Sequence, residues 1–134
     1  MSADRAFIDT NVFIYYQHSD NFEKHRISED TINFFECVVS TQVLNELCNI
    51  LTRKYPTPIS DVKKYIADII QSSDLVIIDD SIIQIALDYH SRYSISYFDA
   101  LMVSAAIESN CKYLVSEDMQ DGLIIDNKLQ ILNI

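Results

Sequence analysis

The chain has 134 residues, 49% of them hydrophobic, and carries a formal net charge of −10 at pH 7. This length supports a single domain over residues 1–134 with a sizeable core, and no apolar run is long enough for a membrane span. With only one glycine, the chain cannot form a P-loop or a dinucleotide-binding fingerprint, because both need several glycines beside phosphate.

The acidic charge balance restricts how the chain can act on nucleic acid. Proteins that hold nucleic acid by electrostatics alone are usually basic. An acidic chain can still act on RNA if divalent metal ions bridge its carboxylates to phosphate and a local basic patch helps. The same acidity suits a basic protein partner.

Short apolar runs alternate along the chain with longer segments of helical periodicity. In chain order they predict a strand at 6–8, a helix at 11–17, a surface helix at 22–33, a strand at 35–39 and helices at 41–54 and 58–70. A strand at 75–78, helices at 80–90 and 98–108, and strands at 113–115 and 129–132 follow. Strands this short and apolar, separated by helices, are typical of a parallel sheet covered on both faces.

Local signals add detail to two of these helices. Thr57 and Pro58 match an N-cap and a first helical position, and Asp80 matches the N-cap of the following helix. The inner face of that following helix is predicted to carry Ile83, Ala86, Leu87 and His90. His90 is therefore interpreted as a core residue rather than a catalyst.

The cysteines and the first residues indicate a protein of the reducing cytoplasm. Cys37, Cys48 and Cys111 are odd in number and widely spaced, unlike a disulfide framework or a CxxC zinc site. The segment MSADRAFIDT lacks the basic start and the long apolar stretch of a signal peptide. We therefore expect a cytoplasmic protein with free thiols.

Four carboxylates lie where the neighbouring residues favour burial. They are Asp9 in AFIDTNVFIYY, Glu46 in STQVLNELCNIL, Asp99 in SYFDALMVSAAI and Asp118 in YLVSEDMQ. Burying an ionised carboxylate is costly unless a cation accompanies it. Four carboxylates in one place would repel one another, so a metal ion is the natural counter-charge.

The predicted elements place these four residues near one edge of the sheet. Asp9 follows the first strand directly, and Asp118 lies three residues beyond Val115, where the strand at 113–115 ends. In open α/β sheets, functional residues gather beyond the carboxyl ends of the strands. Asp99 lies in the first turn of a buried helix, and Glu46 lies at the edge of an apolar helical stripe. One cleft lined by all four side chains is therefore expected.

Each carboxylate also has a simpler interpretation. Ser96 and Asp99 have the spacing of a capping box, and Asp9 has the position of a turn or cap residue. Glu46 at a helix edge would ordinarily be solvated or ion-paired, and Asp118 would be an unremarkable loop residue. The joint occurrence of all four favours a site, because four separate explanations would otherwise have to hold together.

The segments FIDTNVFIYY, STQVLNELCNIL, YFDALMVSAAI and LVSEDMQDG, in this order and at these separations, resemble the PIN-domain family. More narrowly, they resemble the VapC toxins of bacterial toxin–antitoxin pairs. The resemblance covers essentially the whole chain. It implies a three-layer α/β/α sandwich around a mainly parallel sheet of four to five strands. It also implies an endoribonuclease that hydrolyses RNA phosphodiesters with Mg²⁺ or Mn²⁺.

The acidic positions of the family fall on Asp9, Glu46, Asp99 and Asp118, which the resemblance makes both metal-binding and catalytic residues. Asp9 is expected to be the central ligand, with Asp99 and Asp118 as direct or water-mediated ligands. Glu46 would hold a water of the metal or act as a base. Polar support is expected from Thr10, Asn11 and Ser116. Oxygen ligands of this kind select Mg²⁺ or Mn²⁺ over zinc.

The resemblance also implies partners. The family acts on structured RNA such as tRNA or ribosomal RNA, as a homodimer that a cognate antitoxin protein restrains. No membrane association is implied.

One departure from the family keeps alternatives open. Many relatives carry a fifth acid two residues beyond the fourth, where this chain has Gln120; Glu117 and Asp121 lie nearby but at different spacing. A PIN-like RNA- or protein-binding module with weakened catalysis is therefore the alternative. A phosphoacceptor receiver domain fits less well. Its acidic pair would follow the first strand, whereas Asp79-Asp80 follows the third, and its lysine after the last strand is missing.

Overall fold

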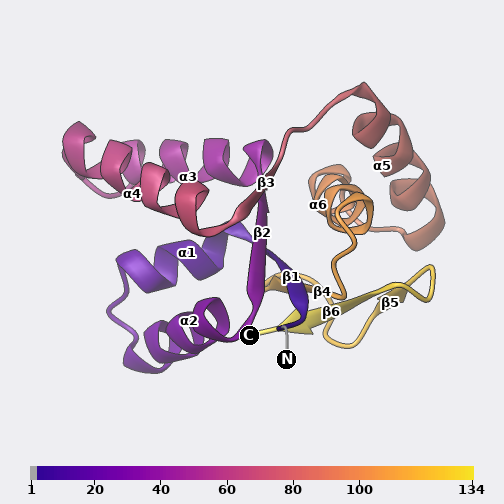
Figure 1. Cartoon of the computed structure of the whole chain (residues 1–134), viewed down its shortest axis with the longest axis horizontal. Helices are drawn as coiled ribbons and strands as arrows, with labels where there is room; N and C mark the ends of the chain where they lie inside the picture. The colour runs from indigo at the N-terminus through magenta and orange to yellow at the C-terminus, as the bar shows by residue number, and fades with distance from the viewer. Residues whose placement is uncertain (1–2) are drawn as a thin grey trace.

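The structure, a computed structural model, describes residues 3–134. The chain forms, in order, β1 (Arg5–Ile8), α1 (Thr10–Gln17), α2 (Phe22–Phe34), β2 (Glu36–Ser40), α3 (Thr41–Arg53), α4 (Ile59–Ser72), β3 (Asp74–Val76), α5 (Asp80–Tyr93), α6 (Tyr97–Glu108), β4 (Tyr113–Ser116), β5 (Ile124–Ile125) and β6 (Leu129–Asn133). Figure 1 shows these elements along the chain. Within residues 3–134, no helix is long and apolar enough to cross a membrane.

The strands form one sheet in the order β3-β2-β1-β4-β6-β5. All neighbouring strands are parallel except β5, which runs antiparallel to β6. The predicted mixed α/β fold with a mainly parallel sheet is thus confirmed, and the sheet has one strand more than the sequence indicated. Asp126 and Asn127, both at positive φ, form the tight turn between β5 and β6. Strand β5 has only two residues, which is too short to show the alternation of apolar and polar residues that marks a strand in a sequence.

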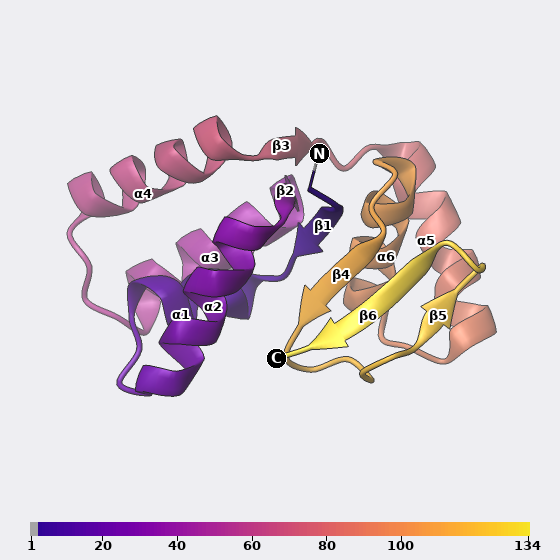
Figure 2. The ribbon, with the colours of Figure 1, turned by 60° about the horizontal axis from the view of Figure 1, so that its bottom comes forward.

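Helices cover both faces of the sheet, as predicted. Figures 1 and 2 show α1 to α4 gathered on one side of the sheet and α5 with α6 on the other. The two groups are separated because the chain adds strands in one direction from β1 to β3 and then crosses over to β4 on the far side of β1. Helix α6 is buried along residues 100–106, and β1 and β4 lie in the core.

The inner face of α5 differs from the prediction. Its buried residues are Ile82, Ala86 and Tyr89, whereas Ile83 and Leu87 are exposed. His90, which the sequence placed in the core, is also exposed, and its Nδ1 lies 2.5 Å from the carbonyl oxygen of Ile95. Two adjacent stripes of this helix are apolar, so its sequence alone does not decide which one faces the core.

Two predicted helix caps are also wrong by one residue. Asp79, not Asp80, caps α5, because its carboxylate accepts a hydrogen bond from the backbone N–H of Ile82 at 2.9 Å. Pro58 occupies the N-cap position of α4 without a side-chain hydrogen bond, and the helix begins at Ile59. Thr57 therefore does not cap this helix.

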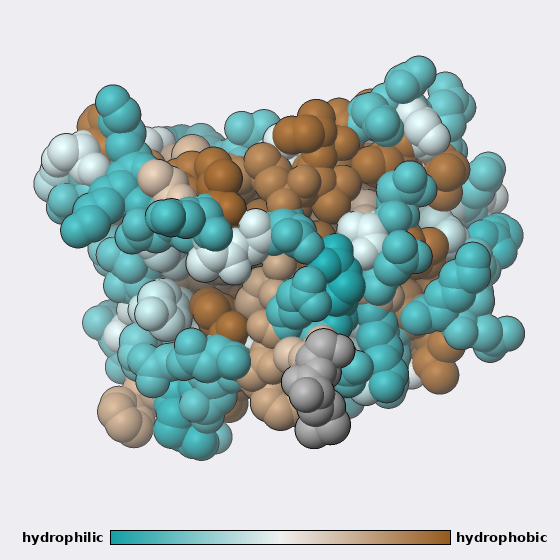
Figure 3. All heavy atoms as spheres, in the orientation of Figure 1, coloured by the Kyte–Doolittle hydropathy of each residue, from teal (hydrophilic) through white to brown (hydrophobic). Residues whose placement is uncertain are grey.

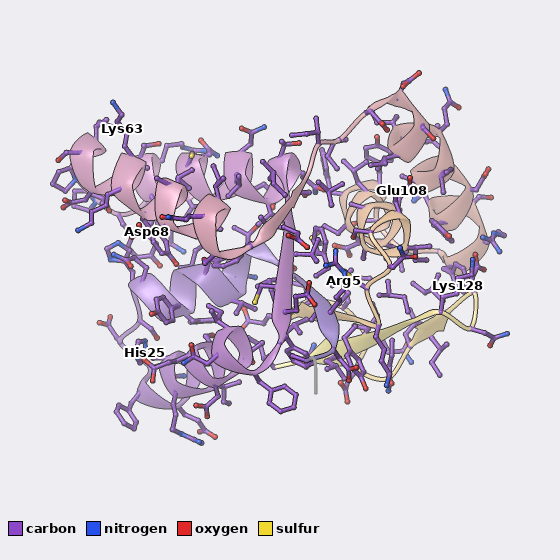
Figure 4. The ribbon with its side chains drawn as sticks, in the orientation of Figure 1. Arg5, His25, Lys63, Asp68, Glu108 and Lys128 are labelled. Atoms are coloured by element: carbon purple, nitrogen blue, oxygen red, sulfur yellow. The ribbon has the colours of Figure 1, made fainter. Side chains whose placement is uncertain are left out.

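Arg5 links three strands at the edge of the sheet where the parallel strands begin, which we call the amino edge. Its Nη1 lies 2.8 Å from the Glu36 carboxylate and 2.6 Å from that of Asp74, at the first residues of β2 and β3. Its Nε donates to the carbonyl of Ser109 at 3.1 Å. Figure 4 labels Arg5 beside these strands. Hydrogen bonds to these acids raise the pKa of Arg5, with Asp74 the larger cause.

Candidate active site

Asp9 lies at the opposite edge of the sheet, between the end of β1 and the start of α1. This edge, where the parallel strands end, is the carboxyl edge. The Asp9 side chain is 5% exposed, and its two oxygens accept hydrogen bonds from the Thr10 N–H (2.6 Å) and the Ser116 hydroxyl (2.9 Å). Burial raises the pKa of Asp9 to about 6. The two hydrogen bonds oppose that shift, while the charges of Glu46 and Asp118 add to it.

Glu46 approaches Asp9 from α3. Its Oε2 accepts a hydrogen bond from the Thr10 hydroxyl at 2.9 Å, and its Oε1 accepts one from the Gln42 amide at 3.0 Å. Thr10 thus contacts both carboxylates, donating its backbone N–H to Asp9 and its hydroxyl to Glu46. We call Asp9 and Glu46 the inner pair; each has both oxygens fixed by protein donors.

Asp99 comes from the other side of the sheet, in the first turn of α6. Ser96 caps this helix, accepting a hydrogen bond from the Asp99 N–H at 3.1 Å, so the capping interpretation describes this backbone correctly. The side chain is also part of the acidic cluster. Partial burial raises the pKa of Asp99, the Ser96 hydrogen bond opposes this, and the charges of Asp118 and Glu46 raise it further.

Asp118 lies on the loop after β4 and is exposed. Its backbone N–H donates to the Ser116 hydroxyl at 3.2 Å, and Asn11 approaches its carboxylate with a long contact of 3.4 Å. Asp99 and Asp118 form the outer pair. They are less tightly bound by the protein than the inner pair, which leaves the Asp118 carboxylate free to move toward a ligand.

The structure therefore brings all four predicted carboxylates to the carboxyl edge, with Thr10, Asn11 and Ser116 between them. Within residues 3–134, no Lys, Arg or His forms an ion pair with any of the four. The charges of Glu46 and Asp118 act on both Asp9 and Asp99, so negative charge is concentrated at this edge. Such a place favours the binding of a cation.

The chemistry of these side chains fits a hard divalent cation. All the candidate ligands are carboxylate or hydroxyl oxygens, which Mg²⁺ and Mn²⁺ prefer, and no His or Cys that would favour zinc is among them. Among the described residues, however, no three His, Cys, Asp or Glu side chains are already close enough to form a metal-holding group. The outer carboxylates would have to move toward the inner pair, which their looser contacts permit.

Apart from Asp118, Glu117 and Asp121 are the acidic residues nearest to Gln120, where many relatives carry a fifth acid, and both contact other residues. Glu117 accepts a hydrogen bond from the Tyr15 hydroxyl at 2.5 Å and pairs with Lys24 at 3.4 Å. That hydrogen bond is the main reason why the pKa of Tyr15 rises to about 12. Asp121 accepts a hydrogen bond from the Asn133 N–H at 2.8 Å. Gln120 itself is exposed.

These contacts hold the loop that carries Asp118. The Asn133 side-chain amide also donates to the carbonyls of Glu117 (2.7 Å) and Met119 (2.8 Å), so the end of β6 holds this loop. Glu117 and Asp121 thus help to hold this loop in place.

Gln42 is a neighbour of the acidic cluster that the sequence did not single out. Its amide lies between Glu46 of its own helix and the carbonyl oxygen of Phe98, at 3.0 and 3.2 Å. The signal in the sequence is its spacing of four residues from Glu46, which places both side chains on one face of α3. The contact with Phe98 has no sequence signal.

Several solved structures similar to this chain come from toxin–antitoxin systems. A toxin–antitoxin complex from Klebsiella pneumoniae has a TM-score of 0.69 at 15% identity and covers 96% of both chains. VapBC2 from Rickettsia felis, bound to a DNA fragment from its promoter, has a TM-score of 0.68 at 17% identity, covering 97% of this chain and 98% of the other.

A third similar structure is VapC20 of Mycobacterium tuberculosis, described as a toxin that cleaves the sarcin–ricin loop. It has a TM-score of 0.67 at 14% identity and covers 81% of this chain and 86% of its own. These identities are low, so the likeness is one of fold. No curated protein matches the chain in sequence. The family model of the PIN domain, however, matches residues 6–120, and the chain therefore belongs to the PIN domain family.

Proposed function

We propose that this protein is the toxin of a VapBC-type pair, a Mg²⁺- or Mn²⁺-dependent endoribonuclease that hydrolyses phosphodiesters in structured RNA. The observation that carries the proposal is the group of four carboxylates at the carboxyl edge of a PIN domain, none of which forms an ion pair with a side chain of residues 3–134. The similarity in fold to VapC toxins and to toxin–antitoxin complexes supports the finer assignment.

The roles of the residues follow from how the protein holds them. Asp9, fixed by Thr10 and Ser116, is suited to be the central metal ligand, and Asp99 and Asp118 complete the site from α6 and the loop after β4. A bound divalent ion supplies charge that activates water and stabilises phosphate oxygens. Glu46, held by Thr10 and Gln42, is suited to orient the attacking water and to accept its proton.

The acidic chain needs a local basic surface to approach RNA. Arg53 and Lys54 at the end of α3, with Lys63 and Lys64 on α4, are all exposed. Figure 4 shows Lys63 at the end of α4 that lies away from the sheet. These residues are suited to contact phosphates of a folded RNA, such as tRNA or ribosomal RNA, whose cleaved strand enters the acidic edge.

Two protein partners belong to the proposal. A cognate antitoxin would restrain the nuclease, as the similar toxin–antitoxin complexes suggest. A second copy of the chain would cover apolar side chains on α5 and α6, where Ile83, Leu87 and Phe98 are 38%, 47% and 62% exposed. Figure 3 shows hydrophobic surface on this side of the molecule. Light scattering should give twice the chain mass, and Phe98→Lys should give the monomer mass.

We place the function in the cytoplasm, which the cysteines support. Cys37, Cys48 and Cys111 are free thiols, as expected of a reducing compartment.

The proposed function is tested by incubating purified protein with total cellular RNA and Mg²⁺ or Mn²⁺. Discrete fragments with 5′-phosphate ends should form, and they should be absent with EDTA and with Asp9→Asn. Cleavage that survives both EDTA and Asp9→Asn would contradict the proposal.

A PIN-like binding module with weakened catalysis is the second candidate. It is favoured by Gln120 at the fifth acidic position, together with the contacts that occupy Glu117 and Asp121. Metal binding and RNA binding without any fragment formation would select this alternative.

A further inference from the structure

We propose that Gln42 is a positioning residue of the active site, whose side-chain amide holds Glu46 and links α3, on one face of the sheet, to α6 on the other. The inference deepens the proposed function and rests on it. Gln42 holds the Glu46 side chain on one layer in place relative to the backbone beside Asp99 on the other, while the Asp99 carboxylate stays free to move.

The Gln42 side-chain nitrogen has two hydrogens, and the structure gives each of them an acceptor. Nε2 lies 3.0 Å from Glu46 Oε1 and 3.2 Å from the carbonyl oxygen of Phe98. Phe98 directly precedes Asp99, one of the outer pair, in the first turn of α6. A single amide therefore fixes the side chain of Glu46 relative to the backbone that carries Asp99.

The orientation of this amide follows from its surroundings. An amide oxygen at the position of Nε2 would face a carboxylate and a carbonyl, which are both acceptors. The other end, Gln42 Oε1, is buried and accepts no hydrogen bond from residues 3–134. The two donated hydrogen bonds, rather than any bond to the oxygen, thus determine how the side chain is placed.

Gln42 also completes the support of Glu46. The Thr10 hydroxyl holds Glu46 Oε2, so without Gln42 the carboxylate could rotate about this one remaining hydrogen bond. The charge of Glu46 acts on Asp99, and like charges push each other apart. A donor shared by Glu46 and the first turn of α6 opposes that separation before any cation binds.

The experiment compares Gln42→Met, which keeps the length of the side chain and removes both donors, with Asn45→Met as a matched control. Asn45 lies on the same helix, is exposed and makes no side-chain hydrogen bond within residues 3–134. Gln42→Asn serves as a second variant, because its shorter amide cannot span both acceptors. Each variant is measured for Mn²⁺ affinity by calorimetry, for kcat and KM on RNA, and for hydrogen exchange of residues 97–101 without metal.

We expect Gln42→Met and Gln42→Asn to lower Mn²⁺ affinity and kcat by about 10-fold each, the scale typical of residues that orient metal ligands. KM for RNA should stay unchanged, because Gln42 is not expected to contact the substrate. Exchange at residues 97–101 should become faster in both variants and remain normal in Asn45→Met. A purely structural role would not separate kcat from KM in this way.

Two failures can be distinguished. A wild-type protein that neither binds Mn²⁺ nor cleaves RNA would overturn the proposed function and this inference with it. A wild-type protein that does both, while Gln42→Met keeps normal Mn²⁺ affinity and kcat, would overturn the inference alone.

Discussion

The two edges of the parallel sheet differ in how they treat acidic side chains. At the amino edge, Glu36 and Asp74 share Arg5, and Asp4 approaches Lys112 at 3.8 Å. At the carboxyl edge, Asp9 and Glu46 have hydrogen-bond donors but no cationic partner within residues 3–134. The same sheet thus pairs Glu36 and Asp74 with a cation at one edge and leaves Asp9 and Glu46 at the other edge without a cationic partner from residues 3–134.

The side chains that hold an acid distinguish one that joins strands from one that can bind a cation. An acid that only joins strands is served best by a basic side chain, as at Arg5. An acid that has to bind a cation from solution is better held by neutral donors, because these fix its position and leave its charge available. Thr10, Ser116 and Gln42 are such donors.

The strongest test of this contrast is Asp9→Asn, which keeps the shape and removes the charge. Mutating a residue that supports a metal ligand typically lowers metal affinity or activity by about 10- to 100-fold. We therefore expect loss of the ligand itself to reduce RNA cleavage at least about 100-fold. The fold should persist, which circular dichroism would verify. Asp68→Asn, an equal charge change at an exposed residue of α4, should cleave normally. Equal activity of Asp9→Asn and wild type would show that the carboxyl edge is not the site.

The stability of the metal-free protein should depend on pH through Asp9. Its pKa rises from 3.8 to about 6 on folding, so the folded state binds the proton more tightly. Protonation of Asp9 therefore adds to the free energy of unfolding. This added stability is fully present below about pH 4 and is lost as the pH rises to about 6, by no more than about 3 kcal/mol. Urea titrations in EDTA should show this fall for wild type relative to Asp9→Asn. Parallel curves for the two proteins would contradict the burial of an ionisable carboxyl group.

Arg5→Met tests the amino edge. We expect it to lower the free energy of unfolding by about 1–2 kcal/mol, because two partly exposed ion pairs and one hydrogen bond are lost. Cleavage per folded molecule should not change. Arg26→Met removes a single exposed contact with Asp30 at 3.7 Å, and it should cost less than Arg5→Met in the same urea titration. A loss of cleavage in Arg5→Met would remove the functional distinction between the two edges.

Glu117→Gln should have the smallest effect. It keeps a partner for Tyr15 and removes the ion pair with Lys24, so the loop of Asp118 loosens without losing a metal ligand. We expect kcat/KM to fall less than about 10-fold. Lys24→Met should add little to it, because both changes remove the Lys24–Glu117 ion pair and Lys24→Met loses in addition only a hydrogen bond to the Ile134 carbonyl oxygen. A loss as large as that of Asp9→Asn would instead make Glu117 the missing fifth acid.

The layers, most of the strands and the gathering of four carboxylates at one edge were predictable from the sequence because each has a local cause. Apolar runs mark strands, and parallel strands place the residues that follow them at one edge. The simpler interpretations of Asp9 and Asp99 were also partly right. Asp9 is the N-cap of α1 and Asp99 donates to the cap residue Ser96, so capping and membership of the acidic cluster coexist.

The features that the sequence did not predict depend on contacts between distant segments. The buried stripe of α5 is decided by its packing on α6, and the short β5 is decided by its pairing with β6. The carbonyl of Phe98 reaches Gln42 across 56 residues of chain, and Tyr15 reaches Glu117 across 102. Such contacts leave no periodicity in the sequence.

The most direct measurement is a Mn²⁺ titration of ¹⁵N-labelled protein followed by NMR line broadening. The paramagnetic ion broadens amide signals close to it, so it reports which edge of the sheet binds. We expect early broadening of the signals of Thr10, Asn11 and Ala100, beside the four carboxylates, while those of Arg5 and Glu36 stay sharp. Early broadening at the amino edge, or equal broadening over the whole acidic surface, would contradict a metal site at the carboxyl edge.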